Sequence, residues 1–500
     1  MNRLDGIVHA MNYARQDGPH QFTTKWLNMS DPYARRGLAA VAFLSITLLA
    51  ACSHSPHRME ASRVEVPSKF MNEAGLAVQQ VPALPAEWWT AYGDPQIDAL
   101  VREALERNTD LAIARARIDE AVAITRRTRA SMFPSLALTP QATRARDFSL
   151  APTISSDARL PLAASWEVDL AGRLSHAADG AQMDAVAVEQ NWFATRWQIA
   201  FETVSAALQQ RQAAELEDLA KERLQIAERL ERLTEQKFKA GQVTGFDIER
   251  TRSEVIALRV EQEQLRRVRG EATHALDVLI GRIPGALGSG PALASLTMPD
   301  WTPRSVPGEL LQQRPDVRAA QARLAAATAR WNAAEGERFP KLVLDLSGGR
   351  QRFENNGTRV AGNIFSLGLG VTLPILDGGA IQAGIDEGSA RSRGAQADLD
   401  RTVLLALQDV ENAYLGWQTQ RTSLQHQVDG LVVADRLLDR SRRLFEAGQV
   451  DATVVAEAER GTLSQRAALV RARADAAVQW GVLAKALSGS PEHVNLQSSP

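Results

Sequence analysis

The sequence predicts a mainly α-helical chain with a small β part suited to a membrane, arranged as two similar halves. Three observations support this fold class. Short segments recur in the same order at an offset of about 206–207 residues. Two stretches are long enough for helices of about 100 Å. Segments before them alternate apolar residues with small or polar ones, as strands with two different faces do.

The repeat rests on three pairs of matching segments. The pairs are Leu105–Leu111 with Leu311–Val317, Met132–Leu138 with Arg338–Leu344, and Lys237–Val243 with Leu444–Val450. Because their order and spacing both persist, we interpret the chain as an internal duplication. The predicted parts are a signal peptide (1–51), a lipidated tether (52–90), a first repeat (91–281), a Gly/Pro-rich linker (282–306), a second repeat (307–488) and a flexible tail (489–500).

Each half is expected to run as helix, two strands, very long helix, tight break and helix. The first helix of each half ends before a Phe-Pro pair, where proline stops a helix. The predicted helices are about 96–131, 173–239 and 245–280 in the first half, and about 308–337, 380–446 and 451–487 in the second.

Apolar residues recur every seven positions in both long helices: Leu219, Ile226 and Leu233 in the first, and Leu431, Leu438 and Phe445 in the second. Arg223 and Arg442 interrupt the companion positions. This pattern predicts antiparallel coiled-coil packing without a strict zipper.

Ala-Gly-Gln-Val follows both long helices and predicts helix–turn–helix tips. Gly241 and Gly448 suit the left-handed position after a helix end. Thr244 and Asp247 have the spacing of a capping box, and Asp451 can cap the corresponding helix of the second half.

The predicted strands are near ten residues long and have one apolar face. The alternating apolar residues are Leu160, Leu162, Ala164, Trp166 and Val168; Phe365, Leu367, Leu369, Val371 and Leu373; Leu342, Leu344 and Leu346; and Leu136 and Leu138 in a weak strand broken by Pro140. Turn-rich loops are expected at Asp147–Ser156 and Glu354–Thr358. These lengths suit tilted membrane strands, although alternation also fits a soluble sheet with one wet face.

Four strands cannot close into a barrel, which needs roughly eight or more, and an open sheet edge is not tolerated in lipid. If the strands lie in a membrane, two or more copies of the chain must share one barrel. Outward leucine and valine would then face lipid, and inward glycine, serine and threonine would line a polar lumen.

Cys52 is the only cysteine of the 500 residues, so it cannot form an intrachain disulfide. Arg35 and Arg36 precede a short apolar run that ends in Leu49-Ala50-Ala51-Cys52. This arrangement resembles a bacterial lipobox, with cleavage between Ala51 and Cys52 and acylation of Cys52. The alternative is an ordinary signal peptide with an incidental cysteine.

The residue after the cysteine and the start of the chain add two expectations. Ser53 favours the outer membrane, because aspartate at this position would resemble an inner-membrane retention signal. Residues 1–28 fit no part of a signal peptide, and Met29 begins a compact one, so we expect Met29 to be the initiator. An unusually long basic region is the alternative.

Charge and motifs exclude several function classes. The net charge of −2 gives no argument for nucleic-acid binding. The sequence contains no run of eighteen apolar residues, so it predicts no transmembrane helix. The sequence contains none of the common metalloprotease, phosphate-binding, nucleophile-elbow or dinucleotide motifs. We therefore expect no enzyme, no metal and no cofactor apart from the lipid on Cys52.

The chain resembles the TolC-like outer-membrane efflux factors, in particular their lipoprotein (OprM-like) branch. The matching segments are the lipobox, Trp88–Trp89 with Asp94–Pro95, Asn108–Leu111, Arg314–Val317, both Phe-Pro pairs, Trp166–Arg173 and Leu373–Gly379. They cover nearly all of the chain from Cys52 to about Ser488. No single motif is specific, but the ordered and doubled set is.

The resemblance implies a homotrimer with a shared twelve-strand barrel and a helical tunnel through the periplasm of a Gram-negative bacterium. It also implies multidrug or other small-solute efflux, driven by an inner-membrane pump through a periplasmic adaptor. The opposing hypothesis is a lipid-anchored periplasmic coiled-coil scaffold without a channel, whose sheets are soluble.

By the same resemblance, an acidic residue nine positions after the second tip glycine belongs to a periplasmic gate. That residue is Glu457, and three-fold symmetry would make it a carboxylate ring. Asp451, Thr453 and Glu459 lie nearby, and the corresponding position of the first half is Arg250. An Arg250–Glu457 contact is one expected latch; solvated charges on helix faces are the alternative.

Overall fold

The structure is a computed structural model. The described residues are 56–73, 87–147, 153–288, 290, 292–293, 296–299, 302–303 and 306–489. The chain divides into two units, 1–56 and 57–500, and the second contains every helix and strand of the described residues. The predictions on the signal peptide, Met29, Cys52 and the last residues of the tail lie outside the described residues.

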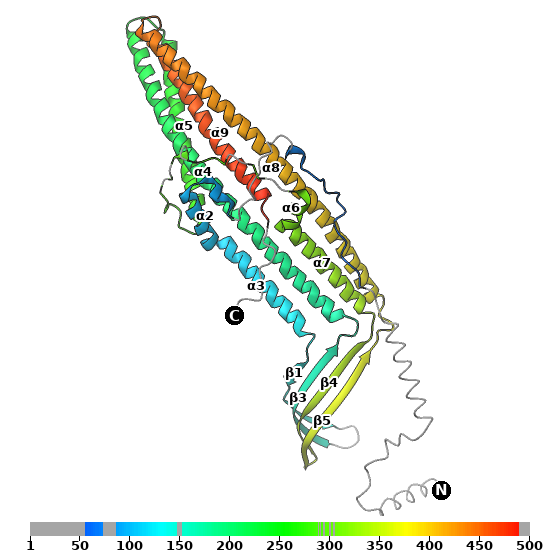
Figure 1. The fold of residues 1–500 in the computed structure, drawn as a ribbon. Coiled ribbons are helices and arrows are strands. Elements are labelled where there is room, and N and C mark those ends of the chain that lie inside the picture. The colour runs from blue at the N-terminus through cyan, green and yellow to red at the C-terminus, as the bar shows by residue number, and fades with distance from the viewer. Residues whose placement is uncertain are drawn as a thin grey trace, which may run out of the picture. The chain divides into compact units, whose positions relative to one another are not determined.

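Two very long helices run through the molecule and match their predicted ranges (Figure 1). They are α4, Arg173–Lys239, and α8, Ala380–Glu446, each of 67 residues. At about 1.5 Å per residue each reaches about 100 Å. The helices α5, Gly245–Leu279, and α9, Ala452–Ala486, turn back and pack along them.

The prediction of one helix at 96–131 and one at 308–337 is wrong, because each is two helices. They are α2, Pro95–Arg107, with α3, Thr109–Ala130, and α6, Pro307–Gln313, with α7, Pro315–Gly336. Asn108 has extended backbone, and its side chain accepts hydrogen bonds from the N–H groups of Asp110 and Leu111, so it caps a new helix. Arg314 is extended because the following proline disfavours helical backbone there.

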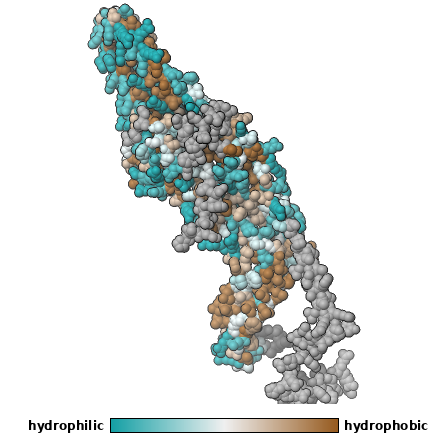
Figure 2. Space-filling model, viewed as in Figure 1, coloured by the Kyte–Doolittle hydropathy of each residue, from teal (hydrophilic) through white to brown (hydrophobic). Residues whose placement is uncertain are grey.

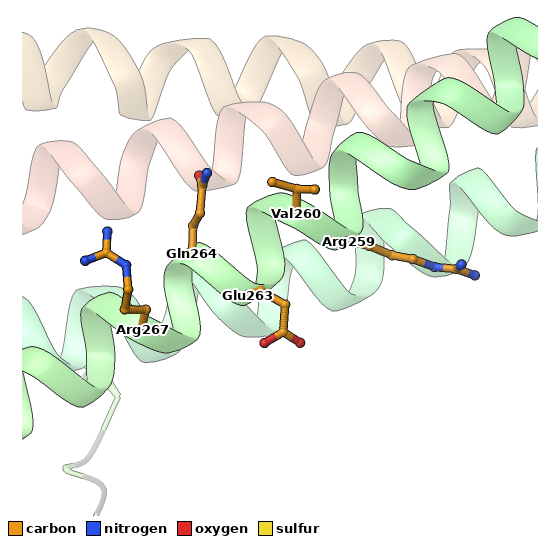
Figure 3. A pocket seen from close by; sticks show the side chains of 5 residues that line it. All are labelled: Arg259, Val260, Glu263, Gln264 and Arg267. Carbon is orange, nitrogen blue, oxygen red and sulfur yellow. The ribbon is translucent and has the colours of Figure 1, made fainter.

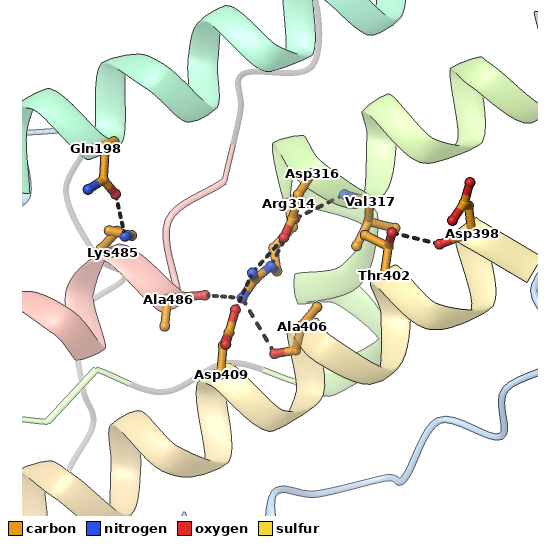
Figure 4. Close-up of polar contacts among 10 residues, drawn as sticks. All are labelled: Gln198, Arg314, Asp316, Val317, Asp398, Thr402, Ala406, Asp409, Lys485 and Ala486. Atoms are coloured by element: carbon orange, nitrogen blue, oxygen red, sulfur yellow. Dashed lines mark hydrogen bonds and ion pairs between the residues drawn. The ribbon is translucent and has the colours of Figure 1, made fainter. Parts of the chain in front are cut away.

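Both breaks are tied to the end of the returning helix of the same half. The Asn108 side chain donates to the carbonyl of Leu279 at the end of α5 over 3.0 Å. Arg314 donates to the carbonyl of Ala486 at the end of α9 over 3.1 Å, and it also pairs with Asp316 and Asp409 (Figure 4). A guanidinium suits this position because the carbonyl end of a helix carries partial negative charge.

The largest core cluster lies where the two halves meet, midway along the long helices. The short helix η2, Trp88–Tyr92, inserts Trp88, Trp89 and Tyr92 into this cluster, beside Trp480 of α9. The Tyr92 hydroxyl donates to the carbonyl of Ala477 over 2.7 Å. The core therefore fixes the second half's returning helix against the start of the first half.

Residues 57–72, within the predicted tether, lie along α7 and α8. Backbone N–H groups of this segment donate to Asn332, Asp400 and Glu411. It ends at the short helix η1, Met71–Glu73. Phe70 is buried in the central core against Tyr414.

One antiparallel sheet joins the strands of both halves. The strands are β1, Ser135–Leu138; β2, Gln141–Asp147; β3, Thr153–Val168; β4, Lys341–Asn355; and β5, Thr358–Thr372. Their order is β1-β3-β4-β5, with β2 also paired to β3, so β1 and β2 share one strand position. The interruption at Pro140 is confirmed.

The strands differ from their predictions in length. β3, β4 and β5 have 15 or 16 residues instead of about ten, because pairing continues past the apolar segments into polar ones. β3 already begins at Thr153, inside the loop predicted at Asp147–Ser156. β5 ends before Leu373. The turn between β4 and β5 is confirmed at Asn356 and Gly357, which both have positive φ.

The apolar heptads pack only along part of the long helices. Ile226 and Leu438 are buried, whereas Phe445 near the second tip is 47% exposed. Arg223 pairs with Glu261 of α5, and Arg442 pairs with Glu459 of α9. Among the described residues, no helix has both the length and the apolar character needed to cross a membrane.

Candidate functional site

The ends of the long helices far from the sheet form two sharp turns (Figure 1). Gly241 and Gly448 have φ of 67° and 71°, a conformation that glycine adopts without strain. After each glycine, the next N–H donates over 2.9 Å to a carbonyl of the last helical turn, that of Lys237 or Leu444. These bonds satisfy helix-end carbonyls and reverse the chain within a few residues.

The helices that follow the turns are capped as expected. Asp247 accepts a hydrogen bond from the N–H of Thr244 over 2.9 Å, which completes the capping box at α5. Asp451 accepts from the N–H of Thr453 at the start of α9. The carboxylate of Asp451 also pairs with Lys237 in the last turn of α4. Asp451 therefore joins the tips of the two halves.

A second ion pair joins the two returning helices further from the tips. Arg460 of α9 contacts Glu254 of α5 at 3.1 Å between nitrogen and oxygen. Arg250 and Glu457 are both exposed, and among the described residues neither has an ion pair or a hydrogen bond through its side chain. The expected Arg250–Glu457 latch is thus not formed within one chain. The Arg460–Glu254 pair links the same two helices instead, whereas the Lys237–Asp451 pair links α4 to the start of α9.

Sequence reasoning missed Lys237, Glu254 and Arg460. For Lys237 the sequence offers one local signal of a role at the tip, because a cation in the last turn of a helix complements the helix dipole. Nothing local distinguishes Glu254 and Arg460 from the other charged residues of these helices. Their pairing depends on how α5 and α9 rotate against each other, which the sequence of one helix does not specify.

The sheet at the opposite end has two different faces. The cross-strand register places the predicted apolar residues of neighbouring strands opposite one another, for example Leu344 with Trp166 and Leu369. Leu136, Leu367 and Leu369 are 66–68% exposed although they are apolar. Figure 2 shows the resulting brown surface on the half of the sheet nearest the helices. Such a surface marks contact with lipid or a partner.

The other face of the same strands is polar or small. It carries Ser165 opposite Asp345, Ala163 opposite Ser347, and Asp345 opposite Gly368. The Ser347 and Ser366 hydroxyls lie 2.7 Å apart across β4 and β5. This face suits water and the apolar face suits lipid, as in membrane strands.

A shallow hollow on α5 is unsuited to a small-molecule site. Its volume is about 420 Å³, and it is lined by Arg259, Val260, Glu263, Gln264 and Arg267 (Figure 3). All five side chains come from one helix, so they do not converge on a common point. In the part of the chain that the structure describes, no cluster of His, Cys, Asp or Glu is arranged to hold a metal ion.

Long paired helices with linked tips, joined to a sheet with an exposed apolar face, define the class of outer-membrane channel subunits. The outer-membrane channel OprN has this fold, with a TM-score of 0.77 and 25% identity over 88% of this chain and 99% of that one. The open-state MtrE outer membrane channel of Neisseria gonorrhoeae matches with a TM-score of 0.76 and 25% identity, over 87% and 98% of the two chains.

The profile of the outer membrane efflux protein family matches residues 100–282 and 306–489. The chain belongs to the outer membrane efflux protein family. The pyoverdine export outer membrane protein OpmQ of Pseudomonas aeruginosa is 30% identical over 457 residues, which cover 88% of this chain and 94% of that protein. The resemblance, the fold class and the outer-membrane location are confirmed. The hypothesis of an efflux channel is confirmed as well, and the hypothesis of a scaffold without a channel is rejected.

Proposed function

We propose that three copies of this chain form the exit duct of a tripartite efflux pump. Drugs or other small solutes enter from a periplasmic adaptor and an inner-membrane pump and leave through the outer membrane. The duct works without catalytic residues, metal, cofactor or nucleic acid. Cys52 carries the lipid that adds an anchor to each copy. The observation that supports this proposal best is the sheet with its two open edges.

The two open edges are complementary. β1 and β2 form one edge and β5 forms the other, and because every pair in the sheet is antiparallel, β5 runs opposite to β1. The β5 edge of one copy can therefore pair with the β1–β2 edge of the next and continue the antiparallel order. Four strand positions in each of three copies give twelve strands, which exceeds the roughly eight needed for closure.

The central experiment measures assembly and conduction of the purified full-length protein. We expect a trimer that dissociates on heating, and discrete ion-conducting events after insertion into planar bilayers. Imaging of the detergent-extracted protein should show a hollow cylinder with three-fold symmetry. A stable folded monomer, or a trimer without conductance under any tested voltage, contradicts the proposal.

We expect Asp451→Asn to raise conductance severalfold at neutral pH. The amide keeps the α9 cap but removes the charge that pairs with Lys237 across the tips. The matched control is Asp435→Asn, which removes a similar exposed pair with Arg466 away from the tips. Equal conductance of the two variants would show that the Lys237 contact does not restrict the opening.

The same contact predicts a pH dependence. The hydrogen bond from Lys237 holds the pKa of Asp451 below its ordinary value. The pair is therefore present above that ordinary value, about 3.9, and is lost as pH falls through the lowered pKa. Conductance of the wild-type protein should rise as the bath is acidified below about pH 4, whereas that of Asp451→Asn should lack this rise.

We also expect Glu457→Ala to raise conductance and to weaken the preference for cations. Glu457 is exposed near the tips, and three copies of it would form a ring of negative charge at the mouth. Asp439→Ala is the control, because it removes an exposed carboxylate about two turns before the tip of α8. Unchanged conductance and selectivity in Glu457→Ala would show that Glu457 is not part of the gate.

A further inference from the structure

Arginines are distributed unequally between the two faces of the sheet. The arginines of the described strands are Arg144 and Arg146 in β2, Arg159 in β3, Arg350 and Arg352 in β4, and Arg359 in β5. All of them lie in the strand portions far from the helices. Since side chains alternate between faces, the register decides which of them share the apolar face.

The register places five of the six on the apolar face. In β4 and β5, Leu346 is opposite Leu367, and the same alternation brings Arg350 opposite Asn363 and Arg352 opposite Ala361. Arg359 of β5 follows on this face, opposite Glu354. Through β3, Arg352 is aligned with Ala158 and then with Ala142, so Arg144 and Arg146 of β2 also belong to this face. Only Arg159 lies on the polar face.

The arginines begin where the apolar belt ends. Arg350 is opposite Leu160, and the belt extends from there to Val168, which is opposite Leu342. The eight steps from Leu160 to Val168 span about 26 Å along the strand, or about 20 Å across the membrane at a tilt of about 40°. This height is close to the apolar band of outer-membrane strands, about 25 Å. Figure 2 shows the change from brown to teal towards the free end of the sheet.

The charge on this face is strongly unbalanced. Five arginines and one carboxylate, that of Glu354, belong to the apolar face, so the formal charge of the strand side chains on this face is +4 in each copy. Glu354 pairs with Arg359 at 2.8 Å. Arg144, Arg350 and Arg352 are exposed, and in the described chain their side chains have neither an ion pair nor a hydrogen bond. On the polar face, Arg159 is neutralised by Asp157 at 2.5 Å.

We propose that this arginine cluster binds the phosphate groups of anionic lipids in the outer leaflet. The inference rests on the proposed function, because it requires the apolar face to meet lipid. A positive cluster on the lipid side cannot contact solutes inside the duct, so solute selection does not explain it. Guanidinium groups suit phosphate because they donate two parallel, charge-assisted hydrogen bonds. Their position just beyond the leucines is the level of the lipid headgroups.

The test uses the full-length trimer in maltoside micelles that contain a diphosphorylated glucosamine-disaccharide lipid. Parallel samples contain the same lipid after phosphatase treatment, or inorganic phosphate alone. Bound lipid is counted by native mass spectrometry, and trimer dissociation is followed on heating. Wild-type protein should retain the phosphorylated lipid and dissociate at a higher temperature with it. Phosphatase-treated lipid and inorganic phosphate should have little effect.

The variant Arg144→Gln/Arg350→Gln/Arg352→Gln should lose at least tenfold in apparent lipid affinity. Arg159→Gln is the matched control, with the same change at a similar level on the other face, and it should bind like the wild type. The single variants Arg350→Gln and Arg352→Gln serve if the triple variant does not assemble. Lipid binding by the variants within twofold of wild type overturns the inference. So does equal binding of the dephosphorylated lipid, or full displacement by inorganic phosphate.

Conductance separates failure of this inference from failure of the proposed function. The triple variant should conduct like the wild type in bilayers made only of zwitterionic lipid, because its substitutions lie outside the lumen. If the wild-type protein conducts normally but shows no phosphate-dependent lipid binding, only the proposed role of the arginine cluster is rejected. Absence of a trimer and of conductance in the wild type rejects the duct itself.

Discussion

Gly349→Val should abolish the heat-dissociable trimer. Gly349 of β4 is opposite Pro161 of β3, where the two halves of the chain pair. A Cβ at Gly349 would overlap the carbonyl oxygen of Leu160 and would lie 2.8 Å from the Cα of Pro161. Both neighbours are backbone and cannot rotate away. We expect a loss of about 3 kcal/mol in stability per chain, at the upper end of ordinary overpacking, and separation of β3 from β4.

The matched control for this prediction is Gly362→Val. Gly362 of β5 is opposite Gln351 and therefore lies on the same polar face as Gly349. An added Cβ there meets no atom within 4 Å. Trimer yield after extraction and the urea midpoint of unfolding measure both variants. If Gly349→Val gives as much trimer as Gly362→Val, the close approach of β3 and β4 does not limit assembly.

Asp94→Ala should cost about 3–5 kcal/mol of unfolding free energy, the usual effect of leaving a buried charge unpaired. Asp94 caps α2 by accepting from the N–H groups of Gln96 and Ile97. It also binds the guanidinium of Arg211 on α4, whose side chain is only 1% exposed. Without the Asp94 carboxylate, the Arg211 guanidinium would keep its 2.9 Å hydrogen bond to the Gln96 side chain but would lose its ion pair.

The control for Asp94→Ala is Glu103→Ala. Glu103 pairs with Arg282 and Arg107, whose side chains are 41% and 62% exposed, so its loss leaves no buried charge and should cost about 1 kcal/mol. The urea dependence of helical circular dichroism gives both values. Replacing both partners, as in Asp94→Leu with Arg211→Met, should recover part of the stability because no buried charge remains. A loss in Asp94→Ala no larger than in Glu103→Ala would contradict a structural role for the pair.

The same pair makes stability depend on pH. Burial alone would raise the pKa of Asp94, but the hydrogen bonds from Arg211 and from the N–H of Ile97 outweigh it and hold the pKa below its ordinary value. The contribution to stability is therefore full above that value, about 3.9, and is lost as pH falls through the lowered pKa. The difference in unfolding free energy between wild type and Asp94→Asn should shrink below about pH 4.

The sequence predicted the long helices closely, because the helical periodicity continues along them and an Ala-Gly-Gln-Val break marks the C-terminal end of each. It did not predict the breaks at Asn108 and Arg314. In both places strong helix patterns continue on either side, and a single capping side chain or a following proline decides the local backbone. The proline at 315 was a usable local signal, whereas the role of Asn108 depends on where its side chain points.

The contacts between the halves were not predictable in the same way. Lys237 and Asp451 are 214 residues apart, and their contact depends on two long helices ending at the same level. The pairing of β3 with β4 likewise joins segments separated by the four helices α4 to α7. Alternation shows which residues of one strand share a face, but only the register between strands shows that the arginines of β2 and β4 share it.

The equal lengths of the helices in the two halves constrain how this gene can change. α4 and α8 both have 67 residues, and α5 and α9 both have 35. Inserting one heptad into α4 and α5 alone would push their turn about 10 Å beyond its neighbour and would separate Lys237 from Asp451. We therefore expect a lengthening by one heptad to be tolerated only when both repeats acquire it. Insertions and deletions in these helices should then occur with equal length in both repeats.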